Sequence, residues 1–287
     1  MKTSHLKPAT TVLWLSLCLI LLSSCATIPS ASERRTAAEM HATRQGWQSI
    51  QIPAGQFELA AFIPVSPSLA HHLTLYFEGD GFAWVSGTQA STDPTPNYPL
   101  ALLLALAQPE GNAAYLARPC QYVDAEKSAC ARRYWTDLRF APEVIAATDH
   151  AVEVLKQKYE ATRLTFVGYS GGAAVAALVA ARRNDVVQLI TVAGNLDHRA
   201  WTAYHHLSPL TGSQNPLDER ERLQSISQFH FAGGKDTLIP PSLIESYAEL
   251  FPEKSRFTVH VEPTFDHHCC WVENWPRLWR IAMNDAL

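Results

Sequence analysis

Short apolar runs alternate along the chain with longer segments in which apolar residues recur at helical spacing. We expect strands over residues 57–63, 73–77, 113–117, 164–167, 186–192, 229–232 and 257–261. We expect helices over 99–107, 142–159, 241–250 and 274–283, and an alanine-rich one from about 173 to 182. Over 142–159 the apolar positions repeat every three or four residues after Pro142, which is typical of an amphipathic helix. The alternation predicts an α/β fold whose mainly parallel central sheet has helices on both faces.

The first residues follow a different pattern. Lys2 and Lys7 precede an apolar run over 12–22 that only Ser16 interrupts. This run is shorter than the roughly 20 apolar residues of a membrane-spanning helix. A basic start followed by a short apolar run is typical of a secretory signal peptide, which we assign to residues 1–24.

The end of that segment reads Leu22-Ser23-Ser24-Cys25. This resembles the lipobox of bacterial lipoproteins, whose cysteine is acylated and becomes the new N-terminus. The resemblance implies a lipid at Cys25 and attachment to a membrane through that lipid. Because Ala26 and not aspartate follows, it also implies the outer membrane, with the protein facing the periplasm. An ordinary signal peptide or an uncleaved anchor are the alternatives.

The polar, Ala- and Ser-rich residues that come next predict a tether over 25–45, ahead of a folded domain over 46–287.

With 47% apolar and 17% charged residues, the 287-residue chain has enough apolar material for one large domain. The net charge is −4 and the basic residues are dispersed, which argues against a nucleic-acid surface.

Four cysteines remain beyond the N-terminal segment: Cys120, Cys130, Cys269 and Cys270. An even number in an exported protein favours disulfides. We favour a Cys120–Cys130 bond, because it closes a short polar loop. The adjacent pair Cys269–Cys270 can form a vicinal bridge or stay reduced, and four free thiols are the alternative.

The run Gly168-Tyr169-Ser170-Gly171-Gly172 fits the pattern G-x-S-x-G and lies between a predicted strand and a predicted helix. A turn this tight leaves no room for bulky side chains two residues either side of the serine. The hydroxyl of Ser170 then stands at a helix start, where backbone N–H groups favour negative charge. The alternative is a glycine-rich turn whose serine only caps the helix.

With this motif in this context, the chain resembles the α/β-hydrolase superfamily from about Phe57 to its C-terminus. The resemblance implies the α/β-hydrolase fold, Ser170 as nucleophile, and a catalytic acid and histidine that come after it in that order. Residues 195–226 form a longer connection than usual, rich in aromatic residues, histidine and proline, and we expect a small lid insertion there.

The predicted strand 73–77 runs into Glu78-Gly79-Asp80-Gly81. The resemblance implies an oxyanion hole made by the backbone N–H of Asp80, with Gly79 or Gly81 as alternatives, and that of Gly171. This loop departs from the superfamily, because Glu78 replaces the usual histidine and Asp80 adds a carboxylate. Arg118 is the candidate partner for that carboxylate. A plain β-turn is the alternative.

The acid and the base are expected after the last strands. Asp236 follows the strand 229–232 in a G-x-x-D turn, and Asp197 is its rival after the preceding strand. His267 and His268 both follow the last strand, and we favour His267 because it lies earlier in the loop. Its neutral imidazole would take the proton of the serine while the aspartate holds its tautomer.

These residues together predict a serine hydrolase that cleaves an ester-like or amide bond through an acyl-enzyme, without a cofactor. Among the 12 histidines we find no metal-binding motif such as H-E-x-x-H. The expected lid is moderately apolar, with Trp201 and Leu207, which is compatible with a small-molecule or lipid-like acyl substrate. An acyltransferase with the same triad, or a non-catalytic binding lipoprotein on this scaffold, are the alternatives.

Overall fold

The computed structural model describes residues 28–69, 71–124, 129–252 and 256–284. The expected signal peptide, 1–24, and Cys25 lie outside the described residues. Residues from Ala31 onward form one compact unit, which contains all of the described strands. Within the described ranges, no helix is both long and apolar enough to span a membrane.

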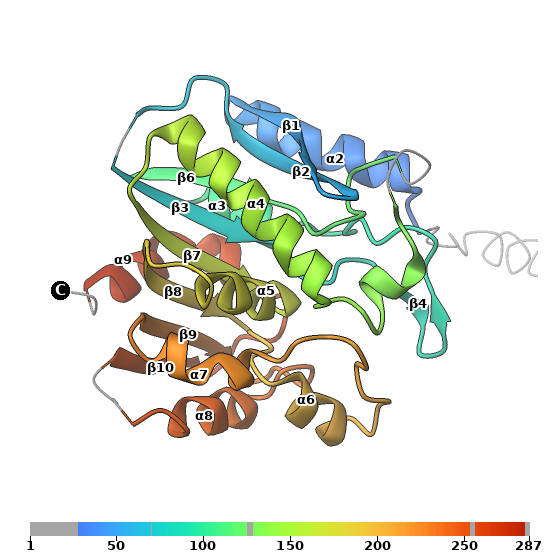
Figure 1. Ribbon diagram of the computed structural model, residues 1–287, viewed down its shortest axis with the longest axis vertical. Coiled ribbons are helices and arrows are strands. Elements are labelled where there is room, and N and C mark those ends of the chain that lie inside the picture. The colour runs from blue at the N-terminus through green and yellow to red at the C-terminus, as the bar shows by residue number, and fades with distance from the viewer. Residues whose placement is uncertain (1–27, 70, 125–128, 253–255, 285–287) are drawn as a thin grey trace, which may run out of the picture. The chain divides into compact units, whose positions relative to one another are not determined.

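An eight-stranded sheet crosses this unit in the order β1-β2-β6-β3-β7-β8-β9-β10 (Figure 1). The strands are β1 (Trp47–Ala54), β2 (Phe57–Pro64), β3 (His72–Phe77), β6 (Asn112–Leu116), β7 (Arg163–Tyr169), β8 (Val186–Val192), β9 (Ser227–Gly233) and β10 (Phe257–Glu262). Among the described pairs of this sheet, β1–β2 and β2–β6 are antiparallel and the others are parallel. The mainly parallel sheet expected from the alternating pattern is therefore confirmed.

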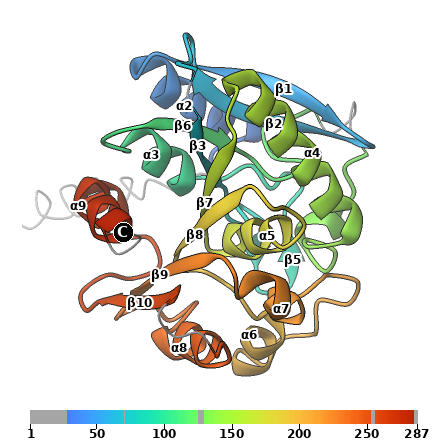
Figure 2. The same ribbon diagram turned by 60° about the vertical axis from the view of Figure 1, so that its left-hand side comes forward.

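Helices cover both faces of the sheet (Figures 1 and 2). One face carries α4 (Pro142–Tyr159), α5 (Gly171–Ala180) and α8 (Pro241–Glu249); the other carries α2 (Ala31–Arg44), α3 (Leu100–Leu106) and α9 (Trp271–Asn284). The described residues form two large apolar cores, one on each face, because successive strand residues point in opposite directions. A smaller cluster consists of Ala232, Ile239 and Ile244. In β3, for example, Leu75 belongs to the first core and Tyr76 to the second.

The smaller elements lie in the connections. They are the hairpin of β4 (Trp84–Ser86) and β5 (Gln89–Ala90), the helices α6 (His198–Tyr204) and α7 (Arg220–Leu223), and the 3₁₀ turns Arg132–Trp135 and Pro216–Glu219. The segment expected as a lid, 195–226, thus contains α6 and α7. That it moves as a lid stays a prediction.

Helix α2 corrects the expected tether over 25–45. Its residues Arg34, Ala38 and Ala42 are buried at four-residue intervals, so one face of the helix packs onto the sheet unit. Arg34 also forms an ion pair with Asp93 at 3.2 Å. The small alanine side chains let a segment of low hydropathy pack closely, and the folded unit accordingly begins at Ala31 and not at residue 46.

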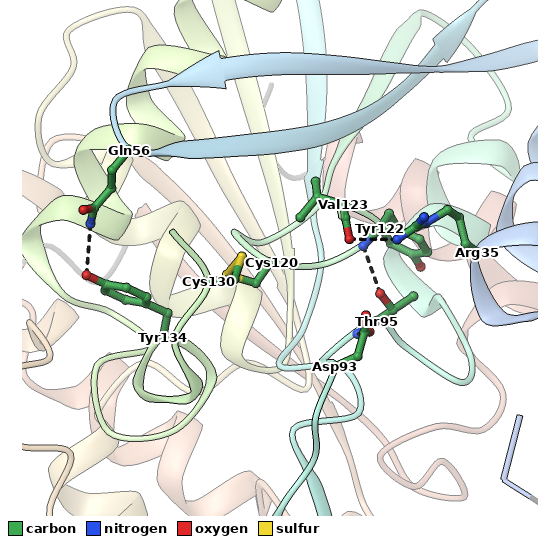
Figure 3. The surroundings of a disulfide bond; sticks show 9 residues. All are labelled: Arg35, Gln56, Asp93, Thr95, Cys120, Tyr122, Val123, Cys130 and Tyr134. Atoms are coloured by element: carbon green, nitrogen blue, oxygen red, sulfur yellow. Dashed lines mark hydrogen bonds between the residues drawn. A yellow bond between two sulfur atoms is a disulfide. The ribbon is translucent and has the colours of Figure 1, made fainter. Parts of the chain in front are cut away.

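The predicted disulfide Cys120–Cys130 is present, with a Cα–Cα distance of 5.5 Å (Figure 3). It closes the loop that comes after β6. The backbone carbonyl of Val123 in this loop accepts a hydrogen bond from Arg35 of α2 at 2.8 Å. Of the two states considered for Cys269 and Cys270, the structure has the disulfide.

The order of the strands creates a crevice at the carboxyl ends of β3 and β7. The chain leaves β3 for β6 on one side and then returns to β7 on the other side of β3. The loops after β3 and β7 therefore diverge, which is where open α/β sheets bind ligands. These two loops hold Glu78–Gly81 and Ser170.

Candidate active site

Ser170 lies in a sharp turn between β7 and α5, with φ 51° and ψ −122°. This is a backbone conformation that residues other than glycine rarely adopt. A Cβ at Gly168 would overlap the backbone of Ala173, and one at Gly172 would overlap the carbonyl oxygens of Phe77 and Glu78. Both glycines that the motif places around the serine are thus required by close packing.

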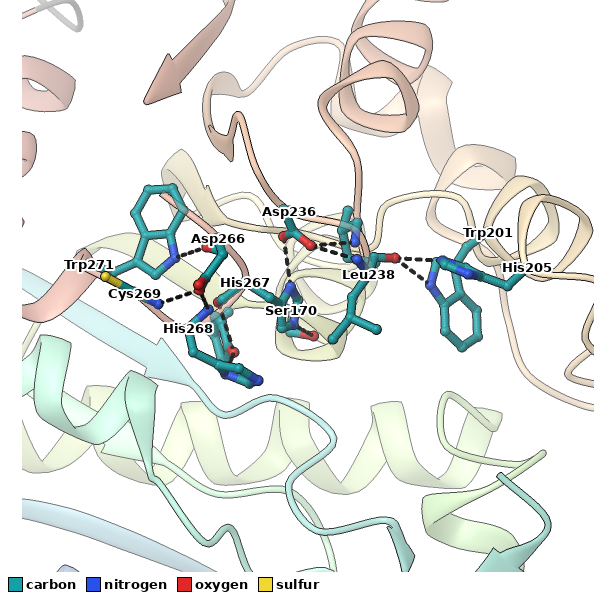
Figure 4. A network of polar contacts seen from close by, with 12 residues as sticks. Ser170, Trp201, His205, Asp236, Leu238, Asp266, His267, His268, Cys269 and Trp271 are labelled. Atoms are coloured by element: carbon teal, nitrogen blue, oxygen red, sulfur yellow. Dashed lines mark hydrogen bonds and ion pairs between the residues drawn. The ribbon is translucent and has the colours of Figure 1, made fainter. Parts of the chain in front are cut away.

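Ser170, His267 and Asp236 form one hydrogen-bonded series (Figure 4). The Nε2 of His267 lies 3.0 Å from the Ser170 Oγ, and its Nδ1 lies 2.7 Å from the Asp236 Oδ2. The other carboxylate oxygen of Asp236 accepts the N–H groups of Leu238 and Ile239, each at 2.8 Å. Because an ionised carboxylate only accepts, the proton of a neutral His267 resides on Nδ1 and leaves Nε2 free to accept from Ser170.

Neighbouring strands bring the acid and the histidine together. β9 and β10 are parallel neighbours, and the loops after them carry Asp236 and His267. The N–H groups of Gly234 and Lys235 donate to the carbonyl oxygens of Glu262 and Phe265, both at 2.8 Å. These bonds hold the two loops in register.

The two alternates that the sequence left open lie elsewhere in the network. His268 faces Tyr169, with 3.0 Å between its Nδ1 and the phenol oxygen, and burial together with nearby His267 lowers its pKa. Asp197 caps helix α6, where its carboxylate accepts the N–H groups of Arg199 and Ala200. In the described chain, neither is hydrogen-bonded to Ser170.

Asp266, which sequence reasoning passed over, organises the loop that carries His267 (Figure 4). Its Oδ1 accepts the N–H groups of His268 at 2.8 Å and Cys269 at 2.7 Å. Its backbone carbonyl accepts the indole N–H of Trp271 at 3.0 Å. An aspartate two or three residues ahead of its N–H partners is a common turn former, and this signal was available in the sequence.

The loop after β3 places Asp80 beside the nucleophile turn. In the described residues the backbone N–H of Asp80 has no hydrogen-bond partner. The N–H of Gly171 belongs to the first turn of α5, where helices leave such groups unpaired. Asp80, Ser170 and Gly171 all line one cavity; that the two N–H groups form an oxyanion hole stays a prediction.

The carboxylate of Asp80 is paired with two arginines. Arg118, the partner expected from the sequence, lies 3.1 Å from Oδ1, and Arg139 lies 2.5 Å from Oδ2. Burial alone would raise the pKa of this carboxyl, but the charges of Arg139 and Arg118 outweigh it and lower the pKa. Asp80 is therefore ionised at neutral pH. The sequence analysis named only Arg118 and did not identify Arg139 as a partner of this carboxylate.

Glu78, the first residue of this loop, is fully buried. Its carboxyl accepts hydrogen bonds from the N–H of Gly79 at 2.9 Å, from the N–H of Ala101 at 3.4 Å and from the phenol of Tyr115 at 3.1 Å. Burial raises its pKa to about 7, against the opposing effect of these hydrogen bonds. Glu78 thus titrates near neutral pH in the loop that carries Asp80.

A cavity of about 950 Å³ opens above Ser170 and His267. Its apolar lining includes Phe82, Trp84, Tyr98, Trp201, Leu207, Pro209, Leu210, Leu238 and Ile239. One wall comes from the segment expected as a lid, whose Trp201 and His205 both hydrogen-bond the carbonyl of Leu238 (Figure 4). Another comes from the β4–β5 hairpin, which the sequence analysis did not expect.

Over the described residues, no group of three or more His, Cys, Asp or Glu could hold a metal ion.

Comparisons with known proteins agree with this architecture at the level of the fold. No family model and no curated protein matches the sequence. An α/β serine hydrolase homologue from Coxiella burnetii superposes with a TM-score of 0.53 at 14% identity, over 83% of this chain and 96% of that one. An esterase from Pyrococcus furiosus gives 0.54 at 16% identity, over 84% and 90%. A serine hydrolase without a lid from Xanthomonas campestris gives 0.53 at 12% identity, over 83% and 93%. The chain therefore has the α/β-hydrolase fold.

Proposed function

We propose that this protein is a serine hydrolase that cleaves ester or amide bonds through an acyl-enzyme on Ser170. The observation that carries the proposal is the series Ser170–His267–Asp236, with hydrogen bonds of 3.0 and 2.7 Å, at the floor of the cavity. The fold alone licenses no activity, so the proposal rests on the site. The similar structures include proteins described as a serine hydrolase homologue and as an esterase, which is compatible with the proposal.

The reaction has two steps. Ser170 attacks the carbonyl carbon while His267 takes its proton on Nε2, and Asp236 stabilises the resulting imidazolium. The N–H groups of Asp80 and Gly171 stabilise the oxyanion. His267 then protonates the leaving group as the C–O or C–N bond breaks. Water, deprotonated by the same histidine, releases the acid and restores the serine. The largely apolar cavity favours a small-molecule or lipid-like acyl substrate.

A fluorophosphonate probe tests this proposal on the purified domain. We expect the wild type to be labelled and Ser170→Ala to lose all labelling, because only an activated serine reacts with the probe. Ser208→Ala is the matched control, since Ser208 lines the same cavity and takes no part in the triad. Absence of labelling in a folded wild type would contradict the proposal and favour a binding protein on a hydrolase scaffold.

We also propose that the protein is exported and anchored to the outer membrane through a lipid on Cys25. The support is the sequence Leu22-Ser23-Ser24-Cys25 after a short apolar run. In cells fed a labelled fatty acid, we expect label on the wild type and none on Cys25→Ala. Blotting for the protein in both samples controls for expression, and equal label on the two forms would refute the anchor.

A further inference from the structure

We infer that Arg118 and Arg139 are positioning residues that act through the carboxylate of Asp80 to fix the oxyanion loop and balance its charge. This inference rests on the proposed function, because it assigns to these arginines a role in the rate of acyl transfer. Neither arginine touches the reacting atoms. They determine where the N–H of Asp80 points and how much negative charge surrounds the oxyanion.

The two arginines hold the carboxylate from different parts of the chain. Arg118 follows β6 and contacts Oδ1, while Arg139 precedes α4 and contacts Oδ2. The guanidinium of Arg118 also donates to the backbone carbonyl of Arg139, and that of Arg139 donates to the carbonyl of Thr136 at 2.6 Å. Both arginine side chains are buried, so neither contact is a mobile surface pair.

The carboxylate of Asp80 lies against the nucleophile turn. A side chain at position 171 would overlap its Oδ1 and Cγ, so glycine at this position makes room for the carboxylate. The side chain of Gln121 also donates to the backbone carbonyl of Gly79 at 3.0 Å. The oxyanion loop is thus held by its side chain and by its backbone, which is the kind of preorganisation on which an oxyanion hole depends.

The charges of the group are arranged to favour an oxyanion. Asp80 and the two guanidiniums together carry a net charge of +1 beside the position where negative charge develops, and Glu78 of the same loop reduces it as that carboxyl ionises near pH 7. An unpaired carboxylate there would repel the oxyanion, and such repulsion is strong in a partly dry site. Loss of either arginine therefore lowers the local positive charge and frees the carboxylate to move.

Arg139 also joins two walls of the cavity. Its guanidinium lies 5.9 Å from the centre of the Trp201 ring on the opposite segment, a cation–π distance. Arg139 and Asp80 both line the cavity, so this ion pair lies at the candidate site. Through this contact, Arg139 links Asp80 to Trp201 of the segment 195–226, which forms another wall of the cavity.

The experiment measures turnover of 4-nitrophenyl butyrate and the rate of fluorophosphonate labelling for Arg139→Gln and Arg118→Gln. We expect kcat and the labelling rate to fall about 10- to 100-fold in each, with KM changed by less than about threefold, as for a defect in the transition state. Arg133→Gln is the matched control, because Arg133 lies in the same connection but pairs with Asp137 at the exposed surface. It should retain wild-type rates.

A double variant separates a positioning role from a merely structural one. Asn at position 80 keeps the backbone N–H and removes the charge, so Arg139→Gln/Asp80→Asn should turn over at least about fivefold faster than Arg139→Gln alone. A double variant no faster than the single one, or a folded Arg139→Gln with wild-type kcat, overturns the inference. Should Arg139→Gln fail to fold, Arg139→Lys decides in its place. Lysine keeps the positive charge, but it lacks the planar guanidinium that contacts both Asp80 and the carbonyl of Thr136. We expect its kcat to be lower than that of the wild type, by a smaller factor than expected for Arg139→Gln.

Failure of this inference is distinct from failure of the proposed function. A wild type that is neither labelled nor active overturns both. A wild type that is labelled, together with a folded Arg139→Gln labelled at the same rate, leaves the triad in place and removes only the role of the arginines.

Discussion

At the scale of single residues, Glu78 makes the stability of the protein depend on pH. Its carboxyl has a pKa of about 7 in the folded protein against 4.5 for an ordinary glutamate, because it is buried. Well below pH 4.5 the carboxyl is protonated in both the folded and the unfolded state, so it makes no contribution to the pH dependence of stability there. Between pH 4.5 and 7 the folded state binds more protons, so stability falls as pH rises through this window. A shift of this size corresponds to about 3 kcal/mol.

Glu78→Gln removes that titration and preserves the shape of the side chain. Measured by urea unfolding, the stability of the variant relative to wild type should increase by about 3 kcal/mol between pH 4.5 and pH 8. Taking the difference between two pH values cancels effects of the substitution that do not depend on pH. Glu221→Gln, on an exposed face of α7, provides the control. A difference that stays constant across this pH range would contradict the assignment.

The candidate site could be predicted from the sequence where one short motif defines a residue's position. Ser170 follows from glycine spacing. For the acid and the base, positions after strands gave pairs of candidates, Asp236 or Asp197 and His267 or His268, of which the first of each pair was favoured. Arg139 gave no such signal, because its partner Asp80 lies 59 positions earlier and only the fold brings them together. The choice between His267 and His268 likewise depends on the loop that Asp266 organises.

At the scale of elements, prediction succeeded where the hydrophobic pattern was strong. The strands β3, β7 and β8 were expected within two residues of their observed ends, since both faces are buried and the runs are apolar. Strand β1 was missed because it lies at the edge of the sheet and few of its residues are buried. The β4–β5 hairpin was missed because β4 is exposed throughout and lacks a core-facing pattern.

At the scale of the whole molecule, a series of polar contacts leads from helix α2 to the loop that carries Asp80. Arg34 pairs with Asp93, whose carboxylate also accepts the N–H of Thr95 at 2.8 Å. The hydroxyl of Thr95 accepts the N–H of Tyr122, which adjoins Gln121 in the disulfide loop (Figure 3). A segment expected to be a simple tether therefore supports the loop that holds Gly79.

A chain that begins at Gly46 should accordingly be less stable and less active than one that begins at Ala31. Its free energy of unfolding should fall by at least about 3 kcal/mol, because Asp93 loses a buried partner and the face that packs on Ala38 and Ala42 becomes exposed. Arg34→Ala isolates the ion pair, and Arg44→Ala, at the exposed end of the same helix, is its control. Urea unfolding and fluorophosphonate labelling rates measure the two effects. Equal stability and labelling of the chains that begin at Ala31 and Gly46 would show that α2 is dispensable and would restore the boundary at residue 46.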